Sequence, residues 1–488
     1  MAIYRRPRQG MAAGDAIPFR HKDQFHLFHL SSPVGTSKFP ERVRTTWSHS
    51  TSRDLVEWEE LAAALPPGEG TAPDANGSWT GSVIEANGEF HLFYTGHELG
   101  AATPQTICRA KSVDCLTFTK DDANPLILPD TDHFESIDWR DPFVFWNEDE
   151  GQYWMLIAAR LKDGSRWRRG CIALATSPDL DHWTLETEPF YAPGNTFCPE
   201  CPEMFKLGGR WYLVYSRFSE DAATLYRVSD SSRGPWKVLA RETLDGRRWY
   251  ASKSMPIDND SRAFFGWVHD RDGATDEGNW LWGGDFTAPR EIRAASDGTL
   301  TVRLPIGVER SYSQKVSIEH VGGVQTRAGS ELVLNAKEGF AHSLLAVEAD
   351  DYLFQCTLEP GAGASKFGLI VRADSELSGL AIVFDRIRSS VSLQKWPAPL
   401  DTFWADLVGR GKELREVDGP RLWEGFLEPP ELTRTATLKL LVSGSVIEVY
   451  INDSLAVSYR MYAKGAFGAF VEDGTLRCAG MTASIRPG

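Results

Sequence analysis

Short runs of alternating bulky and polar residues recur along the first 300 positions of the chain. Each run opens on a polar residue and continues with large hydrophobic side chains, and its first aromatic residue marks the repeat. These aromatic residues are Phe25, Phe90, Tyr153 and Trp211, with a weaker fifth copy at Phe264. Alternation with aromatic enrichment is typical of β-strands. The pattern therefore predicts a β-rich fold with an internal repeat.

A second motif follows the first three aromatic runs, in the same order each time. It reads Ser52-Arg53-Asp54, Ser112-Val113-Asp114 and Ser177-Pro178-Asp179, with an aromatic residue a few positions later, and it has a degenerate form at Ser229-Asp230. A polar turn that enters an outer strand explains such a motif. Two motifs repeating in register indicate propeller blades of about four strands each. Five copies predict an all-β, five-bladed β-propeller.

The repeat ends near Leu304, and the remaining chain has shorter alternating runs. Val446–Ile451, followed by a polar Asn-Asp turn, is one example. Short strands with polar turns favour a β-sandwich. We therefore predict a five-bladed β-propeller catalytic domain over residues 1–305, a linker over 306–330 and a C-terminal β-sandwich over 331–488. The sandwich is expected to pack on the propeller and to be one route to a homodimer.

Charge and cysteine content exclude several classes of protein. The formal net charge of -15 disfavours a nucleic-acid partner, and no stretch of 18 apolar residues predicts a membrane span. Seven scattered cysteines do not form a disulfide framework, so a reducing, cytoplasmic setting is expected. Cys198 and Cys201 form a lone C-x-x-C pair without neighbouring ligands, so we predict no metal site there.

Three acidic residues precede aromatic runs by similar intervals. Asp15 lies 10 residues before Phe25, Asp141 lies 12 before Tyr153, and Glu200 lies 11 before Trp211. Matching places in different blades converge on the propeller axis, so we expect the three carboxylates to face one pocket. Glycoside cleavage needs such a set, because one carboxylate attacks and another protonates the leaving oxygen. Taken singly, each acid is also explained by a turn or a structural salt bridge.

The chain resembles glycoside hydrolase family 32, the invertase, levanase and inulinase group. The likeness is carried by six segments in the family's order, which are Trp47-Ser48-His49 through Trp58, Trp79-Thr80-Gly81-Ser82, Arg140-Asp141-Pro142, Glu200-Cys201-Pro202, Trp249-Tyr250-Ala251-Ser252-Lys253 and Ile447–Asp453. The resemblance implies a retaining β-fructofuranosidase with Asp15 as nucleophile, Asp141 as transition-state stabiliser and Glu200 as general acid/base. It also implies sugar contacts from Trp47, Trp79, Ser82, Arg140, Tyr250 and Lys253, and neither a metal nor an organic cofactor.

The resemblance is weakest around the proposed nucleophile. The family has Asn-Asp-Pro-Asn-Gly there, whereas this chain has Gly14-Asp15-Ala16-Ile17-Pro18. After the first aromatic run the family continues into an aromatic-Gln pair, and this chain has His29-Leu30. Loss of two amide side chains changes which sugar hydroxyls are bonded. We therefore expect the chemistry to be kept and the identity of the sugar or linkage to differ.

Sucrose, fructo-oligosaccharides and related furanosides are the expected substrates, and three alternatives stay open. A fructosyltransferase, including one that forms difructose anhydrides, would use the same acids with a sugar as acceptor. An arabinofuranoside-directed relative would share the five-bladed fold and could invert the anomeric centre. A carbohydrate-binding protein without catalysis would have no need of all three acids.

Overall fold

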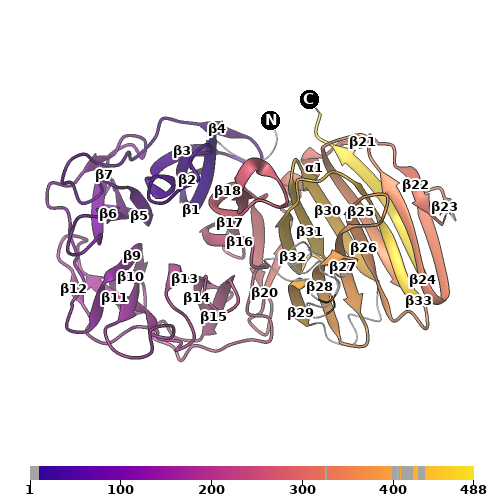
Figure 1. Cartoon of the computed structure of the whole chain (residues 1–488). Helices are drawn as coiled ribbons and strands as arrows, with labels where there is room; N and C mark the ends of the chain where they lie inside the picture. The colour runs from indigo at the N-terminus through magenta and orange to yellow at the C-terminus, as the bar shows by residue number, and fades with distance from the viewer. Residues whose placement is uncertain are drawn as a thin grey trace. The chain divides into compact units, whose positions relative to one another are not determined.

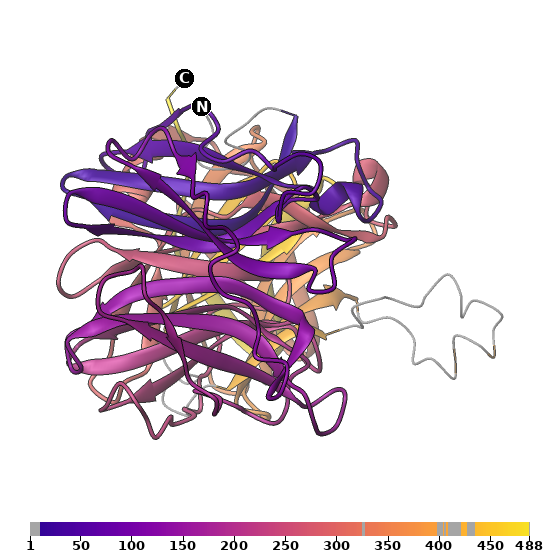
Figure 2. The same cartoon turned by 90° about the vertical axis from the view of Figure 1, so that its left-hand side faces the viewer.

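The computed structural model describes residues 10–324, 327–397, 421–426 and 435–487, together with residues 404 and 407. The described chain is almost entirely β-structure. It divides into two compact units. The chain up to Val308, apart from Ala274–Glu277, forms one unit, and those four residues group with the chain from Glu309 onward in the other. The first unit holds the repeated blades, which Figure 1 shows in indigo through magenta to rose around a common centre, and Figure 2 shows their strands running side by side.

Four-stranded antiparallel sheets form the first three blades. Blade one is β1 (Met11–His21), β2 (Gln24–Pro33), β3 (Thr46–Ser52) and β4 (Trp58–Glu60); blade two is β5 (Ser78–Ala86), β6 (Glu89–His97), β7 (Gln105–Ser112) and β8 (Thr119–Lys120); blade three is β9 (Phe134–Asn147), β10 (Gln152–Leu161), β11 (Gly170–Ser177) and β12 (Thr184–Leu185). Each blade is ordered from the centre outwards. The short helix η1 (Glu41–Val43) connects β2 to β3.

Blades four and five are less regular. Blade four is β13 (Pro199–Leu207), β14 (Arg210–Arg217) and β15 (Ala223–Ser229), with a single bridge from Val228 to Lys237 at its outer edge. Blade five contains β16 (Trp249–Pro256), β17 (Arg262–Arg271), β18 (Trp280–Phe286), β19 (Arg290–Ala294) and β20 (Leu300–Arg303), with η2 (Asp272–Ala274) between β17 and β18. β18 and β19 lie end to end along β17. β18 also pairs with β1 at Gly284 and Ala13, which joins the last blade to the first.

The two sequence repeats mark the same structural positions in each blade. The five aromatic residues all lie near the start of the second strand, on β2, β6, β10, β14 and β17. The Ser-x-Asp motifs form the turn between the third and fourth strands. There the Asp54 carboxylate accepts the backbone N–H of Val56 and Glu57 at 2.8 and 2.9 Å, and Asp114 and Asp179 do the same in their blades. The predicted five-bladed propeller is confirmed.

The second unit is a β-sandwich, as predicted. Its strands are β21 (Gln314–Val316), β22 (Glu319–Gly323), β23 (Arg327–Ala328), β24 (Glu331–Ala346), β25 (Asp351–Pro360), β26 (Lys366–Ala373), β27 (Gly379–Asp385), β28 (Ser390–Trp396), β29 (Arg421–Phe426), β30 (Ala436–Ser443), β31 (Val446–Ile451), β32 (Leu455–Arg460) and β33 (Ala466–Ile485). The long strand β33 pairs with β26 through its first half and with β25 through its second half. β33 therefore joins strands β26–β29 on one side to strands β25 and β30–β32 on the other.

Residues 306–330 differ from the predicted linker. They contain α1 (Ile306–Ser311) and the strands β21, β22 and β23. β21 pairs with β33, and β22 and β23 pair with β24. The polar, loosely alternating sequence of this segment hides its strands, because edge strands bury only one side and carry a weak hydrophobic signal.

Candidate active site

The innermost strand of every blade carries a β-bulge, and the candidate residues sit at these bulges. The pairing with the second strand shifts between Ala13 and Ala16 on β1, Trp79 and Gly81 on β5, Arg140 and Phe143 on β9, Glu200 and Glu203 on β13, and Tyr250 and Lys253 on β16. A bulge leaves residues unpaired and redirects their side chains. The same local device thus presents polar groups to the centre from all five blades.

Three of these bulges also force a left-handed backbone on a residue other than glycine. The φ angles are 60° at Asp141, 51° at Cys201 and 49° at Ala251. Such conformations persist only where surrounding contacts impose them. At Asp141 the backbone N–H donates to Thr95 Oγ1 at 2.7 Å, and the carboxylate accepts the N–H of Cys201 at 2.8 Å. The bulges of blades three and four therefore hold each other.

The three acids occupy successive places across the bulge, not one equivalent place. Glu200 is the last paired residue before its bulge, Asp141 is the first residue inside one, and Asp15 is the second. The offset turns the three carboxylates toward different parts of the same space.

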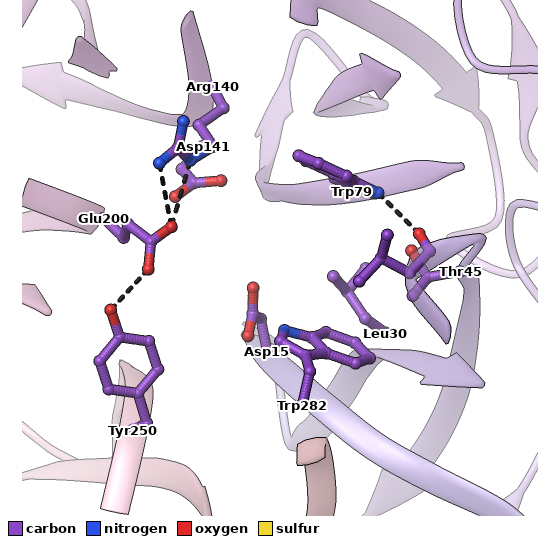
Figure 3. Close-up of a pocket in the computed structure, with 10 residues that line it drawn as sticks. Asp15, Leu30, Thr45, Trp79, Arg140, Asp141, Glu200, Tyr250 and Trp282 are labelled. Carbon is purple, nitrogen blue, oxygen red and sulfur yellow. Dashed lines mark hydrogen bonds and ion pairs between the residues drawn. The ribbon is translucent and has the colours of Figure 1, made fainter. Parts of the chain in front are cut away.

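That space is a pocket of about 160 Å³ at the centre of the propeller (Figure 3). It is lined by Asp15, Leu30, Val43, Thr45, Trp79, Arg140, Asp141, Glu200, Tyr250 and Trp282. Three acids from three blades therefore converge on one cavity. Figure 3 shows Arg140, Asp141, Glu200 and Tyr250 on one side, with Leu30, Trp79 and Trp282 across the pocket from them.

Asp15 has a hydrogen bond on each carboxylate oxygen. Thr80 Oγ1 donates to Oδ2, and Trp267 Nε1 donates to Oδ1 at 3.0 Å. Burial raises the pKa of Asp15 from 3.8 to about 7, with the charges of Asp141 and Glu200 adding to the rise and the two hydrogen bonds opposing it. The group therefore exchanges its proton near neutral pH.

Glu200 sits between a cation and a phenol. Its Oε1 accepts from Arg140 Nη2 at 3.0 Å, and its Oε2 accepts from the hydroxyl of Tyr250 at 2.5 Å. Burial raises the pKa of Glu200, Asp141 raises it further, and Arg140 and Tyr250 act in the opposite direction. Arg140 is itself fixed by Asp138 at 2.6 Å and Gln105 at 2.9 Å. The glutamate is thus locked in one orientation.

Three predicted sugar contacts do not line the pocket. Ser82 Oγ donates to the carbonyl of Pro142 at 2.9 Å, and Lys253 Nζ donates to the carbonyl of Gly81 at 2.8 Å. Trp47 is fully buried, and its Nε1 donates to the carbonyl of Trp79 at 2.9 Å. All three side chains connect neighbouring segments of the propeller, because each donates its polar hydrogen to a backbone carbonyl of another segment.

Several residues that shape the site are not among the site residues predicted from the sequence. Leu30, Val43, Thr45 and Trp282 line the pocket, and Thr80 and Trp267 hold Asp15. The His29-Leu30 departure was the one visible sign of Leu30. Trp282 comes from β18, far along the chain, and reaches the site only because β18 pairs with β1.

Within the described residues, no group of three or more His, Cys, Asp and Glu side chains is arranged to hold a metal ion. The same part of the chain contains no helix long and apolar enough to cross a membrane. Its seven cysteines are all buried and unpaired, including Cys198 and Cys201 of the C-x-x-C pair.

Buried carboxylates that face one sugar-sized cavity are the arrangement that glycoside cleavage needs. The chain belongs to glycosyl hydrolases family 32. The model of the family's N-terminal domain matches residues 6–304, and that of its C-terminal domain matches residues 319–484. The protein is accordingly a glycosidase.

Similar proteins in sequence have related names, and a solved structure has the same fold. An insoluble isoenzyme of beta-fructofuranosidase from Arabidopsis thaliana is 26% identical over 95% of this chain and 89% of its own. A fructan 1-exohydrolase from Aegilops tauschii is 26% identical over 88% of this chain and 76% of its own. Among solved structures, the exo-inulinase from Aspergillus awamori aligns over 99% of this chain and 98% of its own, with a TM-score of 0.73 and 20% identity.

Proposed function

We propose that the protein hydrolyses β-fructofuranosides, such as sucrose and fructo-oligosaccharides, with retention at the anomeric carbon. Asp15 attacks the anomeric carbon and forms a covalent fructosyl-enzyme intermediate. Glu200 protonates the leaving oxygen and then removes a proton from the incoming water. The names of the sequence relatives support fructosides as the substrate class.

The observation that carries this proposal is the contrast between two buried carboxylates in one pocket. Asp15 is bonded by Thr80 and Trp267, neutral donors that stabilise a carboxylate without a counter-charge. Glu200 accepts a hydrogen bond from the hydroxyl of Tyr250 and pairs with the fixed charge of Arg140. Pairs of acids in different environments can divide the roles of nucleophile and proton donor.

Asp141 is assigned to stabilise the transition state. Its backbone is held by Thr95 and its carboxylate by the N–H of Cys201, so it cannot swing towards a reacting carbon as freely as an unrestrained acid. A fixed carboxylate suits hydrogen bonds to sugar hydroxyls that strengthen as positive charge develops on the ring.

Two variants test the roles separately. Glu200→Ala should lower kcat/KM for sucrose by about 10³-fold or more but largely keep kcat/KM for an aryl β-fructofuranoside, whose leaving group needs no proton. Steady-state kcat on the aryl substrate should fall, because Glu200 no longer activates the water that releases the intermediate. Asp15→Ala should lose both activities. NMR of the first-formed fructose anomer checks retention. An equal fall in kcat/KM for both substrates in the Glu200 variant would contradict the acid/base role. An inverted anomer would exclude Asp15 as nucleophile.

Water is proposed as the acceptor. Product analysis at high sucrose concentration checks this point, because hydrolysis releases fructose and glucose in equal amounts. Accumulation of larger or cyclic sugars, with free fructose falling well below glucose, would instead assign the protein as a fructosyltransferase.

A cytoplasmic location and a homodimer are also proposed. Seven unpaired, buried cysteines suit a reducing compartment. Cell fractionation tests the location, and light scattering coupled to gel filtration tests the dimer, for which a mass near twice 54.4 kDa is expected.

A further inference from the structure

The pocket has one polar side and one largely apolar side. Figure 3 shows Arg140, Asp141, Glu200 and Tyr250 on one side, and Leu30, Trp79 and Trp282 beside Asp15 on the other. Val43, whose carbonyl accepts from Trp79 Nε1, also lines the pocket. We call Leu30, Val43, Trp79 and Trp282 the apolar wall. Sugars expose hydroxyls in several directions, so a wall of this kind leaves part of the ligand without hydrogen-bond partners.

Two polar side-chain groups at the apolar wall are already engaged within the protein. Trp79 Nε1 donates to the carbonyl of Val43 at 2.7 Å. The hydroxyl of Thr45, which also lines the pocket, donates to the carbonyl of Ser78 at 2.8 Å. Leu30, 2% exposed, has no polar side-chain atom to offer. In Figure 3 the indole nitrogen of Trp282 lies at the end of the ring nearest Asp15, away from Leu30.

The wall is fixed in place by a close approach that only glycine permits. A Cβ at Gly14 would lie 2.2 Å from Cη2 of Trp282, so the indole rests against the bare backbone beside Asp15. Arg42 Nε donates to the carbonyl of Trp282 at 2.8 Å and anchors that residue from behind. The Trp282 ring also packs 5.7 Å from the ring of Trp267, which bonds Asp15.

The position of the wall shows which part of a substrate it meets. Leu30 lies opposite the bulge formed by Gly14 and Asp15, so the wall flanks the proposed nucleophile. In a double displacement, nucleophile and leaving group are on opposite sides of the anomeric carbon. Residues that flank Asp15 therefore contact the fructosyl ring itself, whereas the leaving group lies toward Glu200.

We propose that one hydroxyl of the fructosyl ring meets the apolar wall and is not recognised, so that the enzyme accepts fructofuranosides deoxygenated at that position. This inference rests on the proposed function. A site built to bond a hydroxyl rejects the analogue that lacks it by about 10⁴-fold, whereas an apolar surface discriminates by at most about 10²-fold and favours the analogue. Leu30 is the residue that sets this selectivity.

The test uses sucrose and its four monodeoxy derivatives at positions 1, 3, 4 and 6 of the fructosyl ring. For the wild type, kcat/KM for one derivative should equal or exceed the value for sucrose, while at least one derivative facing the polar side should fall by about 10³-fold or more. Leu30→Gln should lower the kcat/KM of that one derivative, relative to the kcat/KM of sucrose, by tenfold or more. Comparing variants on the same pair of substrates cancels the intrinsic reactivity of the deoxy sugar.

Leu30→Met is the matched control, because it keeps an apolar side chain of similar volume and should preserve the order of the ratios. Val43→Thr adds a hydroxyl to the wall at nearly constant shape and gives a second measurement if the Gln variant does not fold. Severe rejection of all four derivatives, or an equal change of every ratio in Leu30→Gln, would overturn the inference. If the wild type cleaves neither sucrose nor a fructo-oligosaccharide, the proposed function fails instead.

Discussion

Single residues in the pocket hold the two acids in balance between charged and neutral forms. Burial disfavours the charge on Asp15, and the hydrogen bonds from Thr80 and Trp267 restore part of its stability. For Glu200 the hydroxyl of Tyr250 and the guanidinium of Arg140 act in the same way. Removing one donor should therefore move one limb of the pH–activity profile, because each donor lowers the pKa of its acid.

Thr80→Val is expected to raise the pKa of Asp15 and to move the acid limb of kcat/KM to higher pH. Loss of a hydrogen bond to a charged group, worth about 1.5–3 kcal/mol, corresponds to a shift of roughly one to two pH units. The measurement is a pH profile on sucrose. Thr119→Val, at an exposed position on β8, serves as the control, and an unmoved acid limb would show that Thr80 does not tune the nucleophile.

Tyr250→Phe should act on the other limb. Without the hydroxyl that donates to Oε2, Glu200 holds its proton to higher pH, so the alkaline limb of kcat/KM shifts upward while the acid limb stays. The same profile measures both limbs. A change in the acid limb alone would mean that Tyr250 acts through Asp15 and not through Glu200.

At the scale of elements, the inner strands are joined by side chains that reach from one blade to the next. Lys253, 2% exposed, bonds the carbonyl of Gly81 on β5 and lies over the ring of Phe143 on β9. Glu203 on β13 accepts from Ser254 on β16 and pairs with Arg262 on β17. These buried ties set the distances between the bulges that carry the acids.

Lys253→Met should therefore lower stability while changing substrate binding little. Leaving the carbonyl of Gly81 without its donor costs about 1–3 kcal/mol, and a fall of several degrees in Tm is expected with KM changed less than threefold. Lys237→Met, at an exposed lysine, is the control. A tenfold rise in KM at unchanged Tm would restore Lys253 to the sugar contacts predicted from the sequence.

A further change tests the bulge itself. A Cβ at Gly81 would lie 1.8 Å from the carbonyl oxygen of Phe93, so Gly81→Ala should separate β5 from β6 and displace Thr80. Overpacking of this kind costs about 1–3 kcal/mol, and activity should fall together with Tm. Gly35→Ala, where nothing lies within 4 Å of the added Cβ, should leave both unchanged.

For the whole molecule, a cluster of buried acids is a stability cost that the rest of the propeller offsets. The folded-state pKa of Asp15 is about 7 against 3.8 when exposed. Between these values the folded state binds more protons than the unfolded state, so this group's contribution to stability falls as pH rises from about 4 to 7.

Asp15→Asn should consequently raise Tm by several degrees at pH 8, where the carboxylate is forced to ionise in a buried site, and by little or nothing at pH 4. Thermal unfolding of both proteins at the two pH values makes the comparison. An equal difference at both values would show that the gain comes from packing and not from the charge.

The sequence by itself determined the architecture and the positions of the chemistry. Alternation and aromatic spacing are local consequences of strand geometry, so they repeat visibly wherever a blade repeats, and they placed Asp15, Asp141 and Glu200 on three inner strands. The family resemblance added the expected roles. The strands within 306–330 were not predicted, because burial on one side only leaves a weak hydrophobic pattern.

Only the tertiary structure decided which side chains face the cavity. Lys253, Ser82 and Trp47 lie close to the site in sequence, yet backbone carbonyls of neighbouring segments take their polar atoms. Trp282 enters because β18 pairs with β1 and Gly14 leaves room for its ring. A bulge re-aims a side chain by one residue, and ring closure joins segments about 270 residues apart; neither follows from local periodicity.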